Sequence, residues 1–434
     1  MEEMATLKKK GIWTIMDLPE GKKAVGNKWV FTLKYKSDGS LKRYKAKLVA
    51  QGFTQTQGLD YEETFAPVAK LNSIRILLSL AVNLDRKLHQ LDIKNAFLNG
   101  DLEEEIYMRI PLGFEKDHLK DKVCKLHKSL YGLKQLPRAW FKRFSDTLYK
   151  LGYKQGQADH TLFTKIRKDG KRTILIVYVD DIIITGDNHQ EIENLKEQLK
   201  QAFEVKELGE SWYFLGLEVA RGKEGIFISE RKYTLDLLKE TGKLGCTPAS
   251  TPLEPNWKNK EEEEEHLVDK GMYQRLVGKL IYLSHTRPDI TYVVGIVSQF
   301  MHSPTKRHLE ATYHILKYLK GTPGKGLLFT KSRDRGIIGY TGSDWAGAVK
   351  DNRSTSGYCT KLWGNLVTWQ SKKQQVVSRS SAESEYRSIA QAICEVIWVE
   401  RLMKDLAISV TSPKFLYSDS KSAINIVNNP VQHD

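Results

Sequence analysis

Cysteine is scarce in this sequence, and its four cysteines are not spaced like the ligands of a metal site. None forms a CxxC pair, and no histidine follows at zinc-finger distance. The scattered thiols are Cys124, Cys246, Cys359 and Cys394. We therefore expect reduced, mostly buried thiols rather than a disulfide framework or a zinc finger.

Long apolar runs and a secretion signal are also missing. No stretch of about 18 apolar residues occurs, so we expect no membrane span. The N-terminal segment from Met1 to Lys10 is charged and lacks the apolar core of a signal peptide.

Acidic residues are too few to balance the basic ones. Lys and Arg number 68 against 53 Asp and Glu, which gives a formal net charge of +15 and a pI of about 9.3. This excess suits a polyanion, because each Lys or Arg placed on a phosphate releases condensed counterions. The alternatives are a well-solvated basic surface or a protein of the membrane surface, although no basic amphipathic helix with a strong apolar face is evident.

The length of 434 residues corresponds to two to four domains of about 100–200 residues each. β-branched and alternating runs predict strands, and apolar stripes at helical spacing predict helices. Asp38-Gly39, between the first two runs, is a strong hairpin signal. Strands are expected at 29–35, 44–50, 87–93, 162–167, 172–178, 212–220, 225–229 and 415–417. Helices are expected at 72–84, 138–152, 189–203, 231–241, 273–284, 290–301, 306–319, 381–406 and 420–428.

A change of composition near the middle of the chain predicts a linker or exposed loop. Three prolines precede the run of glutamates from Glu261 to Glu265. Both features are typical of a solvated, disordered segment.

The sharpest local signal is Asp180-Asp181, which follows Tyr178-Val179 inside an apolar hairpin. Charge at the tip of a buried strand pair is costly unless a cation shares it. The alternative is a plain turn, since Asp favours turns. Two adjacent aspartates flanked by Ile, Val and Tyr favour the metal-binding interpretation.

A second acidic signal lies at the end of the predicted strand 87–93. Asp92 is followed by Ile93-Lys94-Asn95-Ala96-Phe97. Two-metal nucleotidyl transfer uses carboxylates to hold a pair of divalent ions about 3.5–4 Å apart. Mg²⁺ prefers a few carboxylate oxygens together with substrate phosphates. Asp92 and Asp180 from separate strands could bridge both ions, with Asp181 nearby, although Asp92 alone could be a helix N-cap.

An ordered series of motifs resembles the polymerase of copia-type retrotransposons, and the resemblance covers almost the whole chain. The motifs keep the family's order and approximate spacing. They are residues 43–53, 58–61, 64–68, 91–100, 131–135, 137–140, 178–181 and 213–216.

The resemblance implies an α+β fold: a right-hand polymerase of fingers, palm and thumb, a helical connection and a partial RNase H-like α/β domain. The implied boundaries are 1–245, a linker at 246–270, a connection at 271–330 and an RNase H-like domain at 331–434. It also implies two Mg²⁺ ions, with Mn²⁺ as an alternative. Implied partners are an RNA template, a DNA primer, an RNA–DNA hybrid and dNTPs, in a cytoplasmic virus-like particle with a nuclear stage.

The resemblance also assigns roles to individual residues. Asp92, Asp180 and Asp181 would be the catalytic metal ligands. Phe97 would lie under the sugar and exclude a 2′-hydroxyl, although it could also be a core residue. Substrate-binding roles fall on Lys45 and Lys47, which could instead form an exposed strand face, and on Tyr131 and Gly132. The primer grip would be Tyr213, Phe214, Leu215 and Gly216. Leu136 stands where the family usually has a small serine, and its bulk near the template could weaken activity.

The C-terminal part resembles the family's RNase H domain, which uses four carboxylates to hold two metals. Glu385 and Asp419 match two of them. The first should stand at Gly342, where Asp344 is the neighbouring acid, and the fourth would follow Asp434. We therefore expect an impaired nuclease that could still hold a hybrid through its basic surface.

Two rival interpretations remain open from the sequence. A decayed element copy would bind nucleic acid without copying it, as Gly342 and Leu136 suggest. A polymerase of the group II intron or telomerase kind is disfavoured by the RNase H motifs. No zinc knuckle, integrase-type HxxH with CxxC, or Asp-Thr/Ser-Gly protease motif occurs.

Overall fold

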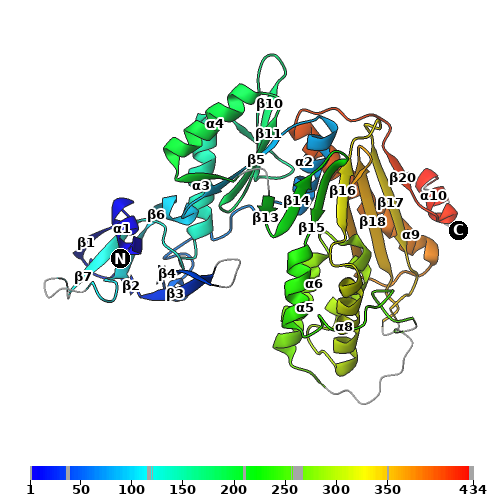
Figure 1. Cartoon of the computed structure of the whole chain (residues 1–434), viewed down its shortest axis with the longest axis horizontal. Coiled ribbons are helices and arrows are strands. Elements are labelled where there is room, and N and C mark those ends of the chain that lie inside the picture. The colour runs from blue at the N-terminus through cyan, green and yellow to red at the C-terminus, as the bar shows by residue number, and fades with distance from the viewer. Residues whose placement is uncertain are drawn as a thin grey trace. The chain divides into compact units, whose positions relative to one another are not determined.

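A computed structural model describes residues 2–35, 40–114, 119, 121–208, 212–255, 257, 267–348 and 351–429 (Figure 1). These residues pack into two compact units, and neither unit is continuous in the chain. The first unit comprises Met1–Ala69, Leu88–Gly156 and His160–Leu208. The second comprises Lys70–Lys87, Gln157–Asp159 and Gly209–Asp434.

A six-stranded sheet forms the centre of the first unit, in the order β12-β5-β11-β10-β9-β8. Every pair of neighbouring strands in it is antiparallel. Isoleucine and valine, which favour strands, dominate the two middle strands, and these residues are buried. The strands are β5 (Leu88–Ile93), β8 (Lys154–Gln155), β9 (Leu162–Ile166), β10 (Arg172–Tyr178), β11 (Asp181–Gly186) and β12 (Val205–Leu208).

Two helices, α3 (Leu136–Lys150) and α4 (His189–Ala202), cover one face of this sheet. The second residue of α3 is a proline, a residue favoured in the first turn because its missing N–H has no partner there anyway. The side chain of Asn188 caps α4 by accepting the N–H of Glu191 at 3.2 Å. Burial of one large apolar side chain stabilises the fold by roughly 1.5–3 kcal/mol. The buried core residues of the two helices include Trp140, Phe144, Leu148, Ile192, Leu195 and Leu199.

The rest of the first unit is a four-stranded sheet, a two-stranded ribbon and a short helix. The sheet has the order β1-β7-β6-β2, and the ribbon pairs β3 with β4. Helix α1 (Glu2–Lys9) packs its apolar residues into the same core as both. The strands are β1 (Trp13–Asp17), β2 (Ala24–Val25), β3 (Asn27–Tyr35), β4 (Leu41–Ala50), β6 (Asp101–Arg109) and β7 (Lys122–Lys128).

The second unit contains two four-stranded sheets. The first has the order β13-β14-β15-β16, and the second has the order β19-β18-β17-β20 with β17 and β20 parallel. The strands of the first are β13 (Trp212–Phe214), β14 (Leu217–Arg221), β15 (Gly225–Ser229) and β16 (Gly326–Thr330). Those of the second are β17 (Ile337–Ser343), β18 (Thr355–Leu362), β19 (Asn365–Lys373) and β20 (Phe415–Tyr417).

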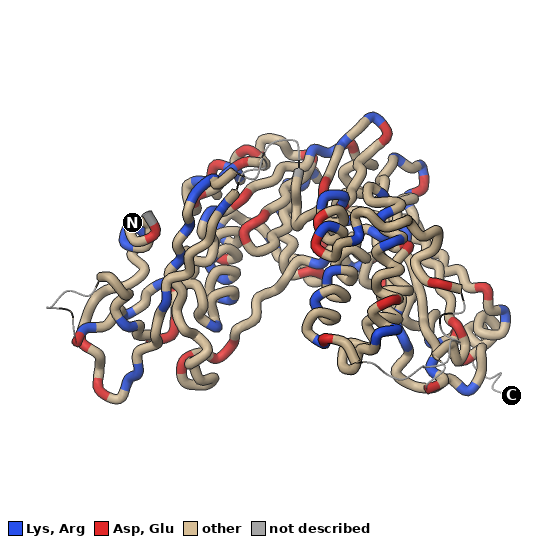
Figure 2. Tube along the Cα trace, turned by 60° about the horizontal axis from the view of Figure 1, so that its bottom comes forward, with Lys and Arg blue, Asp and Glu red and all other residues tan. Residues whose placement is uncertain are grey.

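Helices complete the second unit. Four of them share one apolar core: α5 (Arg231–Glu240), α6 (Lys270–Leu283), α7 (Thr291–Ser298) and α8 (Lys306–Gly321). The long helix α9 (Ser381–Asp405) packs on β17 and β18, and α10 (Lys421–Asn428) packs on α9. Figure 2 shows Lys and Arg spread along both units among Asp and Glu.

Helix α2 (Leu71–Asn83) belongs to the second unit although it precedes β5 in the chain. Eleven of its residues, from Ser73 to Asn83, are buried. Its buried Arg75 donates to the carbonyl oxygen of His285 at 2.8 Å and stacks on Trp369 at 3.8 Å. The helix is therefore a core element of the C-terminal half of the chain.

Most expected elements are confirmed, and the predicted mixture of helices and sheets is correct. The strand expected at 212–220 is wrong, because Leu215 and Gly216 turn the chain and divide it into β13 and β14. Helix α3 begins two residues earlier than expected, at Leu136. The Asp38-Gly39 turn and the Glu261 to Glu265 run lie outside the described residues.

The sequence predicted no membrane-spanning segment and no disulfide or zinc-binding cysteines, and the described residues bear on both expectations. No helix in the described part of the chain is both long enough and apolar enough to cross a bilayer. The four cysteines are free thiols, but the expectation that most are buried is wrong, because only Cys124 is buried, Cys246 and Cys359 are partly exposed and Cys394 is exposed. Burial raises the pKa of Cys124 to about 12, as expected for an inert core thiol.

Candidate active site

The tip of the β10–β11 hairpin consists of two residues, Val179 and Asp180. Tyr178 pairs with Asp181, so the turn contains no other residue. Val179 has a left-handed φ of 57°, which costs a β-branched residue roughly 1–3 kcal/mol. The indole Nε1 of Trp140 in α3 donates to the carbonyl oxygen of Val179 at 2.7 Å. This contact holds the turn, and therefore the backbone of Asp180.

Strand β5 brings Asp92 beside this turn. Asp92 lies directly opposite Asp181 in the register of β5 and β11. The backbone N–H of Ile93 donates to the carbonyl oxygen of Asp180 at 2.9 Å. Residues directly opposite on antiparallel strands share a face, with Cβ atoms about 4.5–5.5 Å apart. The three aspartates expected from the sequence therefore meet at one end of the sheet.

Asp92 and Asp181 project from the face of the sheet that α3 and α4 leave uncovered. Their chain neighbours Leu91, Ile93 and Ile182 belong to the core beneath those helices, and side chains alternate between faces along a strand. The core therefore supports the two strands without enclosing the carboxylates.

Burial and neighbouring charges shift the pKa values of Asp180 and Asp181. Burial raises the pKa of Asp181 to about 6, aided by Asp180 and Asp92 and opposed by a hydrogen bond from Gln90 at 3.2 Å. Burial also raises the pKa of Asp180, with Asp92 adding to the effect and Lys47 and Lys45 opposing it. The cluster therefore carries negative charge that a cation would stabilise.

The carboxylates fit a hard divalent cation, because their oxygens are the donors that Mg²⁺ and Mn²⁺ prefer. Among the described residues, however, no three acidic, histidine or cysteine side chains converge closely enough to hold an ion. The backbone brings the three aspartates to the same end of the sheet, but their carboxylates do not converge on a single position.

A cavity of about 950 Å³ opens beside two of these carboxylates. Its lining comes from α1, the β3–β4 ribbon, β5 and its following turn, the β10–β11 turn and β12. Both basic and acidic side chains line it, including Glu3, Arg43, Lys45, Asp92, Asp180 and Lys206. The space is thus suited to an anionic ligand with bound cations.

Lys47, Tyr131 and Gly132 lie together next to β4. The ammonium of Lys47 stands 4.1 Å above the centre of the Tyr131 ring. Burial raises the pKa of Tyr131 to about 12, helped by Glu3 and Asp180. Gly132 has a φ of 92°, and a Cβ there would lie 2.1 Å from the carbonyl oxygen of Ala50. A glycine is required at position 132 because the backbone of Ala50 comes so close. This packing requirement is separate from the predicted substrate-binding role.

Comparison with known proteins identifies the family. The model of the family described as reverse transcriptase (RNA-dependent DNA polymerase) matches residues 10–255. This chain belongs to the reverse transcriptase family. The matched segment includes all three aspartates and the lysines of the cavity.

Similar curated proteins come from plant transposons, as the motifs predicted. The Retrovirus-related Pol polyprotein from transposon RE1 of Arabidopsis thaliana is 45% identical over 94% of the chain. The corresponding polyprotein from transposon TNT 1-94 of Nicotiana tabacum is 41% identical over 100% of the chain. The chain spans 28% and 33% of the length of these two relatives.

A foamy viral protease-reverse transcriptase, solved in complex with double-stranded DNA, aligns with 96% of this chain and 61% of its own. The TM-score is 0.27 at 12% identity. That alignment is too weak to bear on the fold.

Phe97 follows the end of β5 that carries Asp92. It belongs to a single 3₁₀ turn, Ala96–Asn99, that follows Asn95 in left-handed conformation with a φ of 50°. Its ring is half-buried and meets Tyr131 edge to face, with centroids 6.3 Å apart and planes at 83°. The sugar-sensing role stays a prediction.

The predicted primer grip of the reverse transcriptase is a tight hairpin in the second unit. Leu215 and Gly216 form its turn with positive φ of 53° and 78°. Tyr213 is 61% exposed, whereas Phe214 is buried. Tyr282 of α6 donates to the carbonyl oxygen of Leu215. An exposed aromatic ring on a braced hairpin suits contact with a strand end, and this role also stays a prediction.

The acidic residues predicted for the C-terminal domain differ in the contacts that their carboxylates make. Glu385 on α9 accepts the N–H of Ser343 at 2.8 Å, and Asp419 helps burial to raise its pKa. Asp344 turns its carboxylate toward the backbone N–H of Thr355 instead. Asp344 therefore braces its own loop. The structure gives no support to the idea that it replaces a carboxylate at Gly342.

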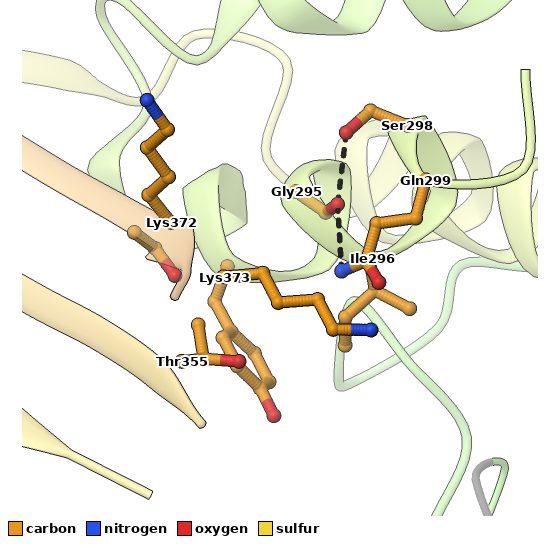
Figure 3. Close-up of a pocket in the computed structure, with 9 residues that line it drawn as sticks. Gly295, Ile296, Ser298, Gln299, Thr355, Lys372 and Lys373 are labelled. Atoms are coloured by element: carbon orange, nitrogen blue, oxygen red, sulfur yellow. Dashed lines mark hydrogen bonds between the residues drawn. The ribbon is translucent and has the colours of Figure 1, made fainter. Parts of the chain in front are cut away.

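A smaller cavity of about 240 Å³ lies in the second unit between α7 and the strands β18 and β19 (Figure 3). Three of its polar side chains already have partners. Ser298 and Gln299 donate to the Gly295 carbonyl oxygen at 2.8 and 3.4 Å. Lys373 lies 2.8 Å from Asp351. None of the residues predicted from the sequence lines this cavity.

Sequence reasoning missed three residues that contact the aspartates, their turn or the cavity of the candidate site. Gln90 could have been found, because it stands two positions before Asp92 and therefore on the same strand face. Trp140 lies in the motif at residues 137–140, but the motif did not indicate its contact with Val179. Glu3 had no signal, since it reaches the cavity from a distant segment.

Proposed function

We propose that this chain is the RNA-directed DNA polymerase of a copia-type retrotransposon. The observation that carries the proposal is the gathering of Asp92, Asp180 and Asp181 at one end of a sheet, beside a cavity lined by basic residues. In this proposal the six-stranded sheet is the palm, the β3–β4 ribbon belongs to the fingers and α5 begins the thumb.

The residues around the cavity then have distinct tasks. Lys45 and Lys47 hold the triphosphate of an incoming dNTP, and Phe97 blocks a 2′-hydroxyl. The primer 3′-hydroxyl attacks the α-phosphate and pyrophosphate leaves. Bound divalent cations, held by the three aspartates, would activate the hydroxyl and stabilise the developing charge. Template RNA, primer DNA and their hybrid are the macromolecular partners.

The C-terminal sheet with α9 and α10 is proposed to be an RNase H-like domain with impaired cleavage. A β17-β18-β19 meander, the helix α9 and the parallel strand β20 support this assignment. Gly342 supplies no carboxylate where the family has one, and Asp344 is engaged with Thr355. Glu385 and Asp419 alone leave too little negative charge for a metal pair.

Primer extension tests both parts of the proposal in one reaction. With poly(rA)/oligo(dT) and Mg²⁺, the chain is expected to extend the primer and to leave the labelled RNA strand uncut. Asp180→Asn removes a charge from the gathered aspartates and should lower extension about 10³-fold or more. The matched control is Asp169→Asn, which changes an exposed aspartate at the other end of β10.

The rival, a decayed copy that only binds nucleic acid, predicts no extension with Mg²⁺ or Mn²⁺. One of the two residues that suggest this rival, Leu136, gives it less support once its packing is known. Leu136 is 8% exposed and packs in the core with Leu130 and Leu133. Its bulk is accommodated inside the protein rather than presented to a template.

A further inference from the structure

Helix α1 reaches the proposed nucleotide cavity. Glu3 and Thr6 both line it, and their spacing of three places them on one side of the helix. Met4 and Leu7 are 7% and 1% exposed and pack in the same core as Leu48 of β4. The helix is thus anchored on β4, the strand that carries Lys45 and Lys47, and the anchor holds Glu3 at the cavity wall.

The carboxylate of Glu3 lies within the field of Lys45 and Lys47. Burial raises the pKa of Glu3, and both lysines act against this effect. Burial and Lys45 lower the pKa of Lys47, while Glu3 and Asp180 act in the opposite direction. Glu3 and Lys45 both line the cavity, and Lys47 lies two residues beyond Lys45 on the same strand, β4.

One oxygen of Glu3 is also poorly satisfied. Oε1 is buried and has no hydrogen-bond partner among the described residues. A buried acceptor without a donor is unfavourable. Glu3 is therefore not held in place by a hydrogen bond to this oxygen, and its charge rather than a fixed geometry is what it contributes to the cavity.

We propose that Glu3 sets the nucleotide affinity of this enzyme by competing with the triphosphate for Lys45 and Lys47. This inference rests on the proposed function. The carboxylate and the triphosphate are both anions drawn to the same ammonium groups, so each weakens the hold of the other. A residue that merely oriented the lysines would act with the opposite sign.

Steady-state primer extension with Glu3→Gln is the first test. The substitution keeps the shape and removes the charge, so KM for dTTP should fall about fivefold, as expected for the loss of a repulsion across several ångströms of partly screened space. The turnover number should stay within about twofold. Glu20→Gln, an exposed glutamate of the same unit, is the control and should change neither value.

A double-mutant cycle locates the effect. In a Lys47→Gln background, Glu3→Gln should lower KM less than it does in the wild type, because one competing cation is gone. Equal effects in both backgrounds, an unchanged KM, or a raised KM in Glu3→Gln would overturn the inference.

Binding of inorganic tripolyphosphate, measured by calorimetry, keeps this inference separate from the proposed function. Its Kd should also fall about fivefold in Glu3→Gln. If the wild type extends no primer but this shift is found, the proposed function fails, and only the competition between Glu3 and a polyphosphate anion for the lysines stands. If the Kd is unchanged, or if the wild type does not bind tripolyphosphate, the inference fails whatever the extension assay gives.

Discussion

Glu230, between β15 and α5, illustrates how burial controls a single carboxylate. The residue is 2% exposed, and neither carboxylate oxygen has a hydrogen-bond partner of good geometry among the described residues. Burial raises its pKa to about 8, against a smaller opposing effect of the Thr286 hydroxyl. The folded chain therefore keeps a proton on Glu230 at pH 7 that the unfolded chain releases.

This difference makes folding stability depend on pH. Because the folded pKa of about 8 exceeds the unfolded value, stability should fall as pH rises through the interval between them, by about 1.4 kcal/mol per pH unit. Glu230→Gln has no ionisation, so its advantage over the wild type should grow from pH 5 to pH 8.

Urea unfolding at several pH values measures this effect. The control Glu224→Gln, an exposed glutamate just before β15, should follow the wild type. Parallel pH profiles of the wild type and Glu230→Gln would contradict the argument.

Among the elements, α2 is tied most clearly to the C-terminal half. Asn365, the first residue of β19, donates to the Ser79 hydroxyl and to the Thr330 carbonyl oxygen, both at 3.0 Å. The side-chain oxygen Oδ1 of Asn365 accepts the N–H of Thr330 at 2.8 Å. Ser79 in turn donates to the carbonyl oxygen of Leu362 at 3.0 Å. One buried amide thus links α2, β16 and β19.

Removing this amide should destabilise the second unit. Asn365→Ala leaves buried partners unsatisfied, which should lower the free energy of unfolding by about 2–3 kcal/mol. Hydrogen exchange should show that α2 and β19 lose protection together. Asn425→Ala, at an exposed position of α10, is the control and should stay within about 0.5 kcal/mol of the wild type. Loss of protection in β19 without α2 would show that α2 is held by other contacts.

The whole molecule carries a net charge of +15, and its basic residues are distributed over both units (Figure 2). Affinity for an RNA–DNA hybrid should therefore depend steeply on salt. With roughly four phosphates neutralised, Kd should rise about 10²-fold between 50 and 200 mM salt.

Fluorescence anisotropy with a labelled hybrid measures that slope. Arg43→Gln, at the cavity wall, should reduce the slope of log Kd against log salt by about one. Lys168→Gln, in the exposed β9–β10 turn, is the control. A flat salt profile would exclude the phosphate backbone as the main contact.

The sequence by itself determined most local elements and pointed to the three aspartates of the candidate site. Apolar runs flanking Asp180-Asp181 specified a hairpin with acids at its tip, and alternation placed Asp92 and Gln90 on one face of β5. These features depend on near neighbours in the chain, which a local pattern records.

Tertiary structure alone decided which distant segments meet. It paired Asp92 with Asp181, brought Glu3 to the cavity, turned Asp344 toward Thr355 and placed α2 in the second unit. An apolar stripe specifies that a helix must be buried but not which surface buries it, because many surfaces offer the same hydrophobic gain. Only the packed chain, with its specific hydrogen bonds and volumes, selects one of them.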